Sequence, residues 1–259
     1  MKLMINHQTH YQYTELASQS IQYIKMSPQT NIHQQVHSWD VSVPGQKQVT
    51  KDVFDNLWIT STQNFDYQNL MIMAQGVVEI DTSNQLGIGG GLSPIQFLQP
   101  TPTTYCNLEM LEFAQKYVTQ ISKEKLINLA EALLVHMPYI SLSTSVSHTA
   151  IESFEAKQGV CQDHSHVFIA MCKAIGIPAR YVSGYLFVPN TSHLASHAWA
   201  EVFIDQAWHC FDISNQLFQP SSHIYVAIGR DYWDVAPVRG MRAKGGLESM
   251  YSIVQVLAC

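Results

Sequence analysis

Glycine and proline are concentrated in one stretch that interrupts regular structure part-way along the chain. Residues 87–106 contain a glycine triplet and three prolines: Gly89-Gly90-Gly91, Pro94, Pro100 and Pro102. Glycine destabilises helices and strands alike, and proline lacks the backbone N–H that both use. We therefore expect a linker here, between an N-terminal domain over residues 1–86 and a second domain over residues 107–259.

The N-terminal part has the patterning of β structure. Bulky side chains recur at every second position in one segment: His37, Trp39, Val41 and Val43. This is the period of a half-buried strand. Further strands are expected over residues 21–26 and 70–80, and the turn-prone pair Asp55-Asn56 predicts a hairpin. Several short strands separated by turns predict an antiparallel, β-sandwich-like domain.

Beyond the linker the pattern becomes helical. Asn107 and Ser122 are placed to cap two helices, and Thr149 with Glu152 forms a capping box before a third. Gly159 is placed to end that third helix. These signals predict a helical layer at the start of the second domain.

A fourth helix is expected over residues 161–175, followed by strands. Its buried stripe has the i, i+3, i+4, i+7 spacing and consists of Val167, Ala170, Met171 and Ala174. Strand-like segments then lie near residues 181–188, 197–204, 208–213 and 224–228. The whole chain is therefore expected to be an α+β protein, in which helices of the second domain pack on an antiparallel sheet.

Cys161 is the strongest candidate for a reactive residue. It follows Gly159-Val160 at the expected start of the fourth helix. A helix N-terminus presents unpaired N–H groups and partial positive charge, which favour a thiolate over a thiol. A thiolate is the nucleophile that attack on an amide or ester requires, and the same N–H groups can hold an oxyanion.

A histidine and an acid on two later strands would complete such a site. His197 begins one expected strand and Asp212 lies on the next. We therefore expect the two strands to form a hairpin around Asp205-Gln206. A four-residue loop, 203–206, would set His197 opposite Asp212. A three-residue loop, 205–207, would instead pair His197 with Asn215 and need a bulge to bring Asp212 close.

These residues lie in four blocks that together resemble the transglutaminase-like superfamily of papain-fold enzymes. The blocks span residues 159–163, 176–185, 196–202 and 208–212. The first part of the chain resembles the bacterial transglutaminase-like N-terminal region. The matching residues there are Tyr11-Gln12-Tyr13-Thr14, Met26-Ser27-Pro28-Gln29, Trp39 and Val77-Val78-Glu79. The resemblance covers nearly the whole chain.

The resemblance implies a role for each of the three candidate residues. Cys161 would be the nucleophile, His197 the general base and acid, and Asp212 the acid that orients the imidazole. It also implies acyl transfer at an amide through a thioester. The order of cysteine, histidine and acid along the chain is that of papain-type enzymes.

The chain departs from the family pattern in two places. Ile213-Ser214-Asn215 follows the acid, where the family usually has Pro or Thr and then Asn. No Trp lies between Trp58 and Trp199, so the Trp that assists the oxyanion in animal transglutaminases is missing. Trp199 either lines the acyl-binding cleft or packs in the interior, and Arg180 is expected to be a buried, paired cation.

Cys161, His164 and His166 also suggest a metal site, but helix geometry opposes it. Residues two apart on a helix, such as the two histidines, point to different faces. We therefore expect no metal and no cofactor. Asp163, in the first turn, suits the helix dipole but would oppose thiolate formation, so we expect a structural role for it.

Charge and cysteine usage narrow the partners and the compartment. The chain has 14 Lys and Arg against 20 Asp and Glu, a formal net charge of -6. Duplex nucleic acids and anionic membranes attract basic surfaces, so neither is an expected partner. Five scattered cysteines without a C-x-x-C pair, and an N-terminus without an apolar segment, predict a cytoplasmic protein with free thiols.

The resulting hypothesis is a cytoplasmic cysteine peptidase, amidase or acyltransferase that acts on a peptide or isopeptide carbonyl. Hydrolysis is favoured over crosslinking, because water is always present whereas amine selectivity needs a dedicated site. The alternative is a non-catalytic binding or scaffold protein that retains the fold. The expected partner is a peptide or protein substrate, whose identity the sequence leaves open, as it does the oligomeric state.

Overall fold

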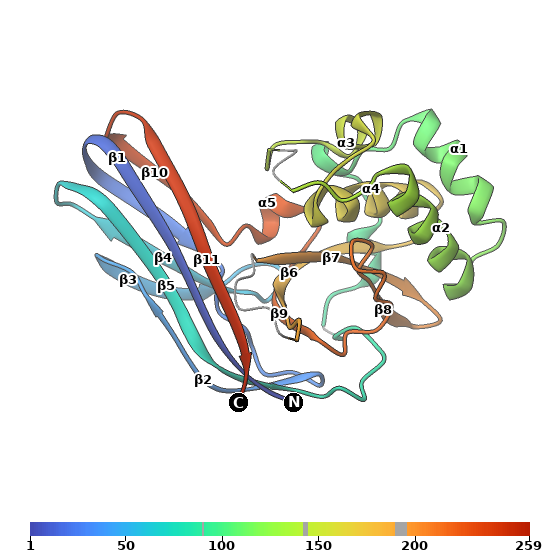
Figure 1. Cartoon of the computed structure of the whole chain (residues 1–259), viewed down its shortest axis with the longest axis horizontal. Coiled ribbons are helices and arrows are strands. Elements are labelled where there is room, and N and C mark those ends of the chain that lie inside the picture. The colour runs from blue at the N-terminus through green and yellow to red at the C-terminus, as the bar shows by residue number, and fades with distance from the viewer. Residues whose placement is uncertain (90, 142–144, 190–195) are drawn as a thin grey trace.

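The computed structural model describes residues 1–89, 91–141, 145–189 and 196–259. It combines a curled antiparallel sheet with a smaller sheet that is covered by helices (Figure 1). The two termini lie together at one end of the curled sheet, where the Cys259 N–H donates to the Lys2 carbonyl at 3.1 Å. Within the described ranges, no helix is long and apolar enough to cross a membrane.

The curled sheet contains seven strands among the described residues. Its order is β2-β5-β1-β4-β3, and β10 and β11 also pair with β1. The bounds are Lys2–Ile24 for β1, Gln34–Ser42 for β2, Gln46–Lys51 for β3, Leu57–Gln63 for β4, Tyr67–Ile80 for β5, Val238–Lys244 for β10 and Glu248–Ala258 for β11. The predicted strands near residues 37–43 and 70–80 correspond to β2 and β5, and the predicted hairpin joins β3 to β4.

The sheet folds over on itself because β1 is irregular near its middle. β5 and β11 flank the first half of β1, whereas β4 and β10 flank the second half. At the fold, Gly245 and Gly246 have φ values of 100° and 61°, and a Cβ on Gly246 would lie 2.3 Å from the Thr14 hydroxyl. The halves share one apolar core: Tyr13, Ala17, Ile24, Met26, Val41, Ile59, Tyr67, Leu70, Ile72 and Ala74. This is the sandwich-like arrangement that the sequence predicts.

The C-terminal segment corrects the predicted domain division. Residues 107–259 were expected to form the second domain, but β10 and β11 leave it and pair with β1 in the first sheet. Val254 and Val256 of β11 are fully buried there. No strand was expected beyond residues 224–228, and no local signal indicates that residues 238–258 join the first sheet.

The second part consists of helices packed on a sheet of order β8-β7-β6-β9. Its helices are α1 (Leu108–Tyr117), α2 (Lys123–His136), α3 (Ala150–Ala156), α4 (Cys161–Ala174) and α5 (Tyr232–Val235), and its strands are β6 (Ala179–Leu186), β7 (His197–Ile204), β8 (Ala207–Phe211) and β9 (His223–Gly229). Asn107, Ser122 and Thr149 cap α1, α2 and α3 as predicted. Gly159 does not end α3, because Lys157 already adopts the left-handed conformation there, with φ of 53°.

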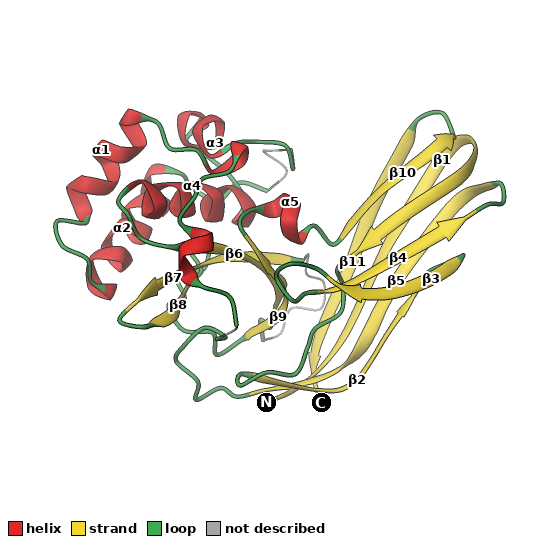
Figure 2. Ribbon diagram, turned by 180° about the vertical axis from the view of Figure 1, so that it is seen from behind, coloured by secondary structure: helices red, strands yellow, loops and turns green. Residues whose placement is uncertain are grey.

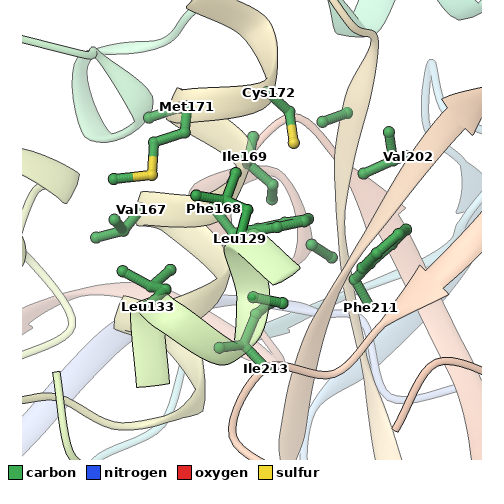
Figure 3. Close-up of a cluster of buried hydrophobic side chains, with 14 of the residues drawn as sticks. Leu129, Leu133, Val167, Phe168, Ile169, Met171, Cys172, Val202, Phe211 and Ile213 are labelled. Carbon is green, nitrogen blue, oxygen red and sulfur yellow. The ribbon is translucent and has the colours of Figure 1, made fainter. Parts of the chain in front are cut away.

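Helix α4 lies at the centre of this part, between the other helices and the sheet. Every residue from Gln162 to Lys173 is buried, so the single buried stripe predicted for this helix was wrong. Ala174, which was placed in that stripe, is exposed. Figure 3 shows Phe168 and Ile169 of α4 in one apolar cluster with Leu129 of α2 and Phe211 of β8. Burial on all sides fixes the position of α4, and with it Cys161.

The glycine- and proline-rich stretch contains two short 3-10 helices, Pro94–Phe97 and Pro102–Thr104. It is packed rather than free, because Phe97 is fully buried against Trp208 at a centroid separation of 5.4 Å. The Gly87 N–H donates to the Trp208 carbonyl at 2.8 Å. The segment therefore connects the two parts and also covers one end of the second sheet.

The two sheets meet at β9, the edge strand of the smaller one (Figure 2). Two side-chain amides from the curled sheet's part of the chain bond its backbone. Gln34 bonds both the N–H and the carbonyl of Tyr225, each at 2.8 Å. Asn56 does the same at Ile228, again at 2.8 Å. An unpaired strand edge is prone to non-native pairing, and these amides occupy it.

Candidate active site

Cys161 is the first residue of α4, and the turn before it is held by Asp163. One Asp163 oxygen accepts from the Val160 N–H at 2.8 Å, and the other accepts from the Ser153 hydroxyl at 2.9 Å. A Cβ on Gly159 would lie 2.7 Å from the Asp163 Cβ, so only glycine fits there. The structural role expected for Asp163 agrees with these contacts. The first i to i−4 bond of the helix runs from the His164 N–H to Val160, which leaves the Cys161 N–H outside the helical ladder.

His197 and Asp212 come together through the β7–β8 hairpin, but in a register that neither prediction gave. Ile204 pairs with Ala207 across a two-residue turn, and Asp205 and Gln206 in that turn have φ values of 50° and 62°. Both predicted loops were too long. The observed two-residue turn has positive φ at both positions, which matches the twist of the flanking strands. β8 ends at Phe211, and Asp212 leaves the ladder toward His197.

The Asp212 carboxylate binds the ring of His197 directly. The His197 Nε2 donates to Asp212 Oδ2 at 2.7 Å, and the carboxylate is fully buried. This leaves Nδ1 as the ring nitrogen available to Cys161, which lines the same cleft as His197 and contributes to its raised pKa. The structure therefore brings together the three residues that the sequence selected, in the order thiol, imidazole, carboxylate.

The electrostatics of these three groups favour a protonated imidazole. Burial alone lowers the pKa of His197, but the Asp212 charge, the bond to Asp212 and the contact with Cys161 together raise that pKa to about 10. Burial would raise the pKa of Asp212, and the adjacent His197 holds it below its usual range instead. An imidazolium beside Cys161 is the environment that stabilises a thiolate.

Two further residues hold the Asp212 carboxylate, and sequence reasoning assigned neither. The His223 Nε2 donates to Asp212 Oδ2 at 3.1 Å. The Asn215 amide donates to the same oxygen at 3.0 Å and to Oδ1 at 3.2 Å. Asn215 follows the acid closely and could have been found from that spacing. His223 lies on a later strand, β9, and no motif marks it.

His223 is fully buried and is packed edge-on against Trp199, with ring centroids 4.7 Å apart. Burial lowers the pKa of His223, so it donates to Asp212 as a neutral ring. Trp199 is itself fully buried, which decides in favour of the interior position left open by the sequence. The carboxylate therefore has a neutral donor on one side and the charged His197 on the other.

His197, Asp212 and His223 also carry three ligand atoms within 4.8 Å of one another. Their hydrogen bonds satisfy these atoms mutually, and two of the three side chains are fully buried. A cation here would have to displace the proton from each ring, so the site fits a hydrogen-bonded relay better than a metal centre.

The metal site suggested by Cys161, His164 and His166 does not fit the positions of the two histidine rings. His164 bonds the Met137 carbonyl at 2.7 Å and the Ser214 hydroxyl at 2.8 Å. His166 accepts from the Tyr232 N–H at 3.1 Å. These two rings therefore point away from each other, as the helical spacing predicts.

Arg180 is the buried, paired cation that the sequence predicts. Its Nε donates to Glu201 Oε2 at 2.7 Å, and its guanidinium lies 4.0 Å from the centroid of the Trp208 ring. Tyr225 donates to the other Glu201 oxygen at 2.6 Å. This network ties β6, β7 and β9 together beneath the site.

A cleft of about 750 Å³ opens at Cys161 between the two parts of the chain. Its wall on the side of the helices and the smaller sheet includes Val160, Tyr181 and His197. The opposite wall comes from the curled sheet and includes Tyr11 and Met250. A substrate that reaches Cys161 therefore contacts both parts.

Two protein families match parts of the chain. Residues 112–213 match the transglutaminase-like superfamily, and residues 3–79 match the bacterial transglutaminase-like N-terminal region. The first match contains Cys161, His197 and Asp212. Residues 112–213 therefore match a transglutaminase-like core, and a bacterial transglutaminase-like N-terminal region precedes it in the same chain.

Two relatives of similar length are described as uncharacterized proteins. The chain is 26% identical over 277 residues to the protein ML0607 of Mycobacterium leprae, covering 98% of each. It is 25% identical over 275 residues to Rv2569c of Mycobacterium tuberculosis, covering 92% of this chain and 86% of the relative. The similarity therefore extends through both parts and carries no activity with it.

One solved structure shares the whole arrangement. It is the crystal structure of a "putative cysteine protease" from Cytophaga hutchinsonii, with a TM-score of 0.81 and 23% sequence identity. The match covers 99% of this chain and 90% of the other. The likeness confirms the fold, including the position of the curled sheet beside the helical part.

Proposed function

We propose that this protein is a cysteine amidase that cleaves or transfers the acyl group of a peptide or isopeptide amide through a thioester on Cys161. The observation that carries the proposal is His197, which lines the cleft with Cys161, donates to the buried Asp212 carboxylate at 2.7 Å and has its pKa raised to about 10. A non-catalytic scaffold would have no need to maintain a buried carboxylate and a protonated imidazole beside a thiol at a cleft.

The acylation step follows from the positions of these groups. The Cys161 thiolate attacks the carbonyl carbon, and the charge that develops on oxygen faces the N–H groups at the start of α4. His197 then gives its proton to the leaving amine as the C–N bond breaks. The products are a Cys161 thioester, a neutral imidazole and a free amine.

Deacylation reverses the role of the imidazole. Neutral His197 removes a proton from water, the resulting hydroxide attacks the thioester, and the thiolate and imidazolium are restored with release of an acid. An amine in place of water would give transfer instead. Hydrolysis is the proposed outcome, because none of the described residues that line the cleft is an Asp or Glu that could bind an incoming amine.

A labelling experiment tests the proposal. Iodoacetamide at neutral pH should alkylate Cys161 first, while burial raises the pKa of Cys106 to about 11 and also raises the pKa of Cys172 and Cys210. Cys259 is exposed, so labelling is read by peptide mass spectrometry against a Cys259→Ser control. Cys161→Ala should abolish turnover of peptide amide substrates, by at least roughly 10⁴-fold.

Two results would oppose the proposal. One is uniform labelling of the accessible thiols with no preference for Cys161. The other is a protein whose Cys161→Ala variant turns over peptide amides as fast as the Cys259→Ser control. Either would favour the scaffold hypothesis.

A further inference from the structure

One face of the curled sheet forms a wall of the cleft. His7, Thr9 and Tyr11 of β1 line it, and alternate residues of a strand point to the same face. Met250 and Ser252 of β11 line it as well. The strand register pairs Thr9 with Ser252 and Tyr11 with Met250, so these side chains form a continuous surface opposite Cys161.

Among the described residues, the lining of the cleft carries no permanent charge outside the Cys161–His197 pair. None of the described residues that line it is Asp, Glu, Lys or Arg. Burial lowers the pKa of His7 to about 4, and its ring is held by Tyr185 at 3.0 Å and by Ser252 at 2.8 Å. His7 is therefore neutral at pH 7, although the chain as a whole has a net charge of -6.

The tyrosines of the cleft stay neutral too. Burial raises the pKa of Tyr11, Tyr181 and Tyr232. Each therefore presents an aromatic ring and an un-ionised hydroxyl at neutral pH, which can donate a hydrogen bond to a peptide carbonyl.

Apolar side chains are exposed on both sides of the cleft. Tyr139 and Val146 of the helical part are 50% and 49% exposed, and Met250 of the curled sheet is 56% exposed. The nearby carboxylates do not offset this character, because Asp163 and Asp212 are fully buried and hydrogen-bonded. A charged substrate side chain would lose water here without gaining a counter-charge.

We propose that the cleft selects an uncharged, apolar peptide segment next to the reacting carbonyl, and that the Tyr11–Met250 face of the curled sheet does the selecting. This inference rests on the proposed function, since Cys161 must react for selection to be seen. It gives the N-terminal region and the C-terminal strand a shared role in substrate choice.

The test uses capped dipeptide acyloxymethyl ketones that differ in one side chain. Inactivation of the wild-type protein at Cys161 should be at least about tenfold faster with Leu or Phe than with Glu or Lys at that position. Equal rates, or faster reaction of the charged probes, would overturn the selection while leaving the proposed function intact if iodoacetamide still labels Cys161 selectively. Failure of both reagents at Cys161 would overturn both.

A pair of matched variants locates the selecting wall. Met250→Lys should lower the preference for the Leu probe over the Glu probe by several-fold, because it adds a counter-charge to the cleft. Met71→Lys is the control, since Met71 is 45% exposed on β5 and pairs with His10, on the other face of the sheet. Ser252→Lys serves as a second cleft variant should Met250→Lys not fold. An equal effect of Met71→Lys, or no effect of either cleft variant, would exclude this face as the selecting wall.

Discussion

The two sheets of this protein are assembled from the chain in different ways. The smaller sheet uses four strands that follow one another between residues 179 and 229, and it carries His197. The curled sheet takes five strands from the N-terminal part and two from the C-terminal end, with β1 at the centre. The smaller sheet brings His197 and Asp212 together through the tight β7–β8 turn, whereas the curled sheet holds the two chain ends together and forms the far wall of the cleft.

This difference predicts which property each substitution should alter. Substitutions around the smaller sheet should alter the chemical step and its pH dependence. Substitutions where the curled sheet meets β9 should alter the stability of the assembly. Activity and stability should therefore both be measured for each variant. A variant that changes the quantity assigned to the other sheet would contradict this difference.

Asp212→Asn should give the largest effect. The amide cannot balance an imidazolium, so turnover should fall by roughly 10²–10⁴-fold while KM changes little. The measurement is kcat and KM with the fastest neutral peptide substrate, together with the midpoint of thermal unfolding. A variant with unchanged kcat would show that Asp212 only caps a turn.

The pH dependence should reveal the protonated state of His197. Its pKa is raised to about 10 from the ordinary 6.5, so its charge pair with Asp212 stabilises the fold fully below pH 6.5, and this contribution is lost as pH rises toward 10. Turnover should accordingly show a basic limb near pH 10, where the leaving amine loses its proton donor. Asp212→Asn should move that limb to lower pH, and a wild-type limb near pH 7 would contradict the assignment.

His223→Ala should lower kcat by about tenfold, with KM unchanged, because Asp212 loses a neutral donor that fixes its orientation. His223→Gln keeps an amide donor near the position of Nε2 and should restore most of the loss. The hydrogen bond from His223 favours the ionised Asp212 carboxylate, so its loss should raise the pKa of Asp212. The acid limb of turnover should therefore move to higher pH in His223→Ala. Equal kcat losses in both variants, tracking equal losses of stability, would indicate packing alone.

Gln34→Ala should give the smallest effect on chemistry and a measurable one on stability. It leaves the N–H and carbonyl of Tyr225 without their side-chain partners, which should lower the free energy of unfolding by about 2 kcal/mol. Gln35→Ala is the matched control, because the adjacent side chain is exposed. Denaturant unfolding measures the difference, and kcat should stay within about twofold of wild type for both.

Much of the second part could be predicted because its signals are local. Capping residues, glycine turns and short spacings determine where α4 and β7 begin, and the family resemblance adds the roles of Cys161, His197 and Asp212. The hairpin register was missed by one or two residues, since Asp205 and Gln206 are not glycine or asparagine and yet adopt positive φ. The buried surroundings of α4 were missed for another reason, because contact with several elements leaves no single periodic stripe.

The sequence pattern could not predict contacts between segments that are distant in the chain. His223 reaches Asp212 only because β9 lies beside β6, and β11 joins β1 only when both chain ends meet. The sequence by itself determined the fold class and singled out Cys161, His197 and Asp212 as candidates, because caps, turns and strand patterns depend on neighbours a few positions away. The tertiary structure decided the donors around Asp212, the sheet to which residues 238–258 belong and the lack of Asp, Glu, Lys and Arg among the described residues of the cleft, because these depend on which surfaces the folded chain buries together.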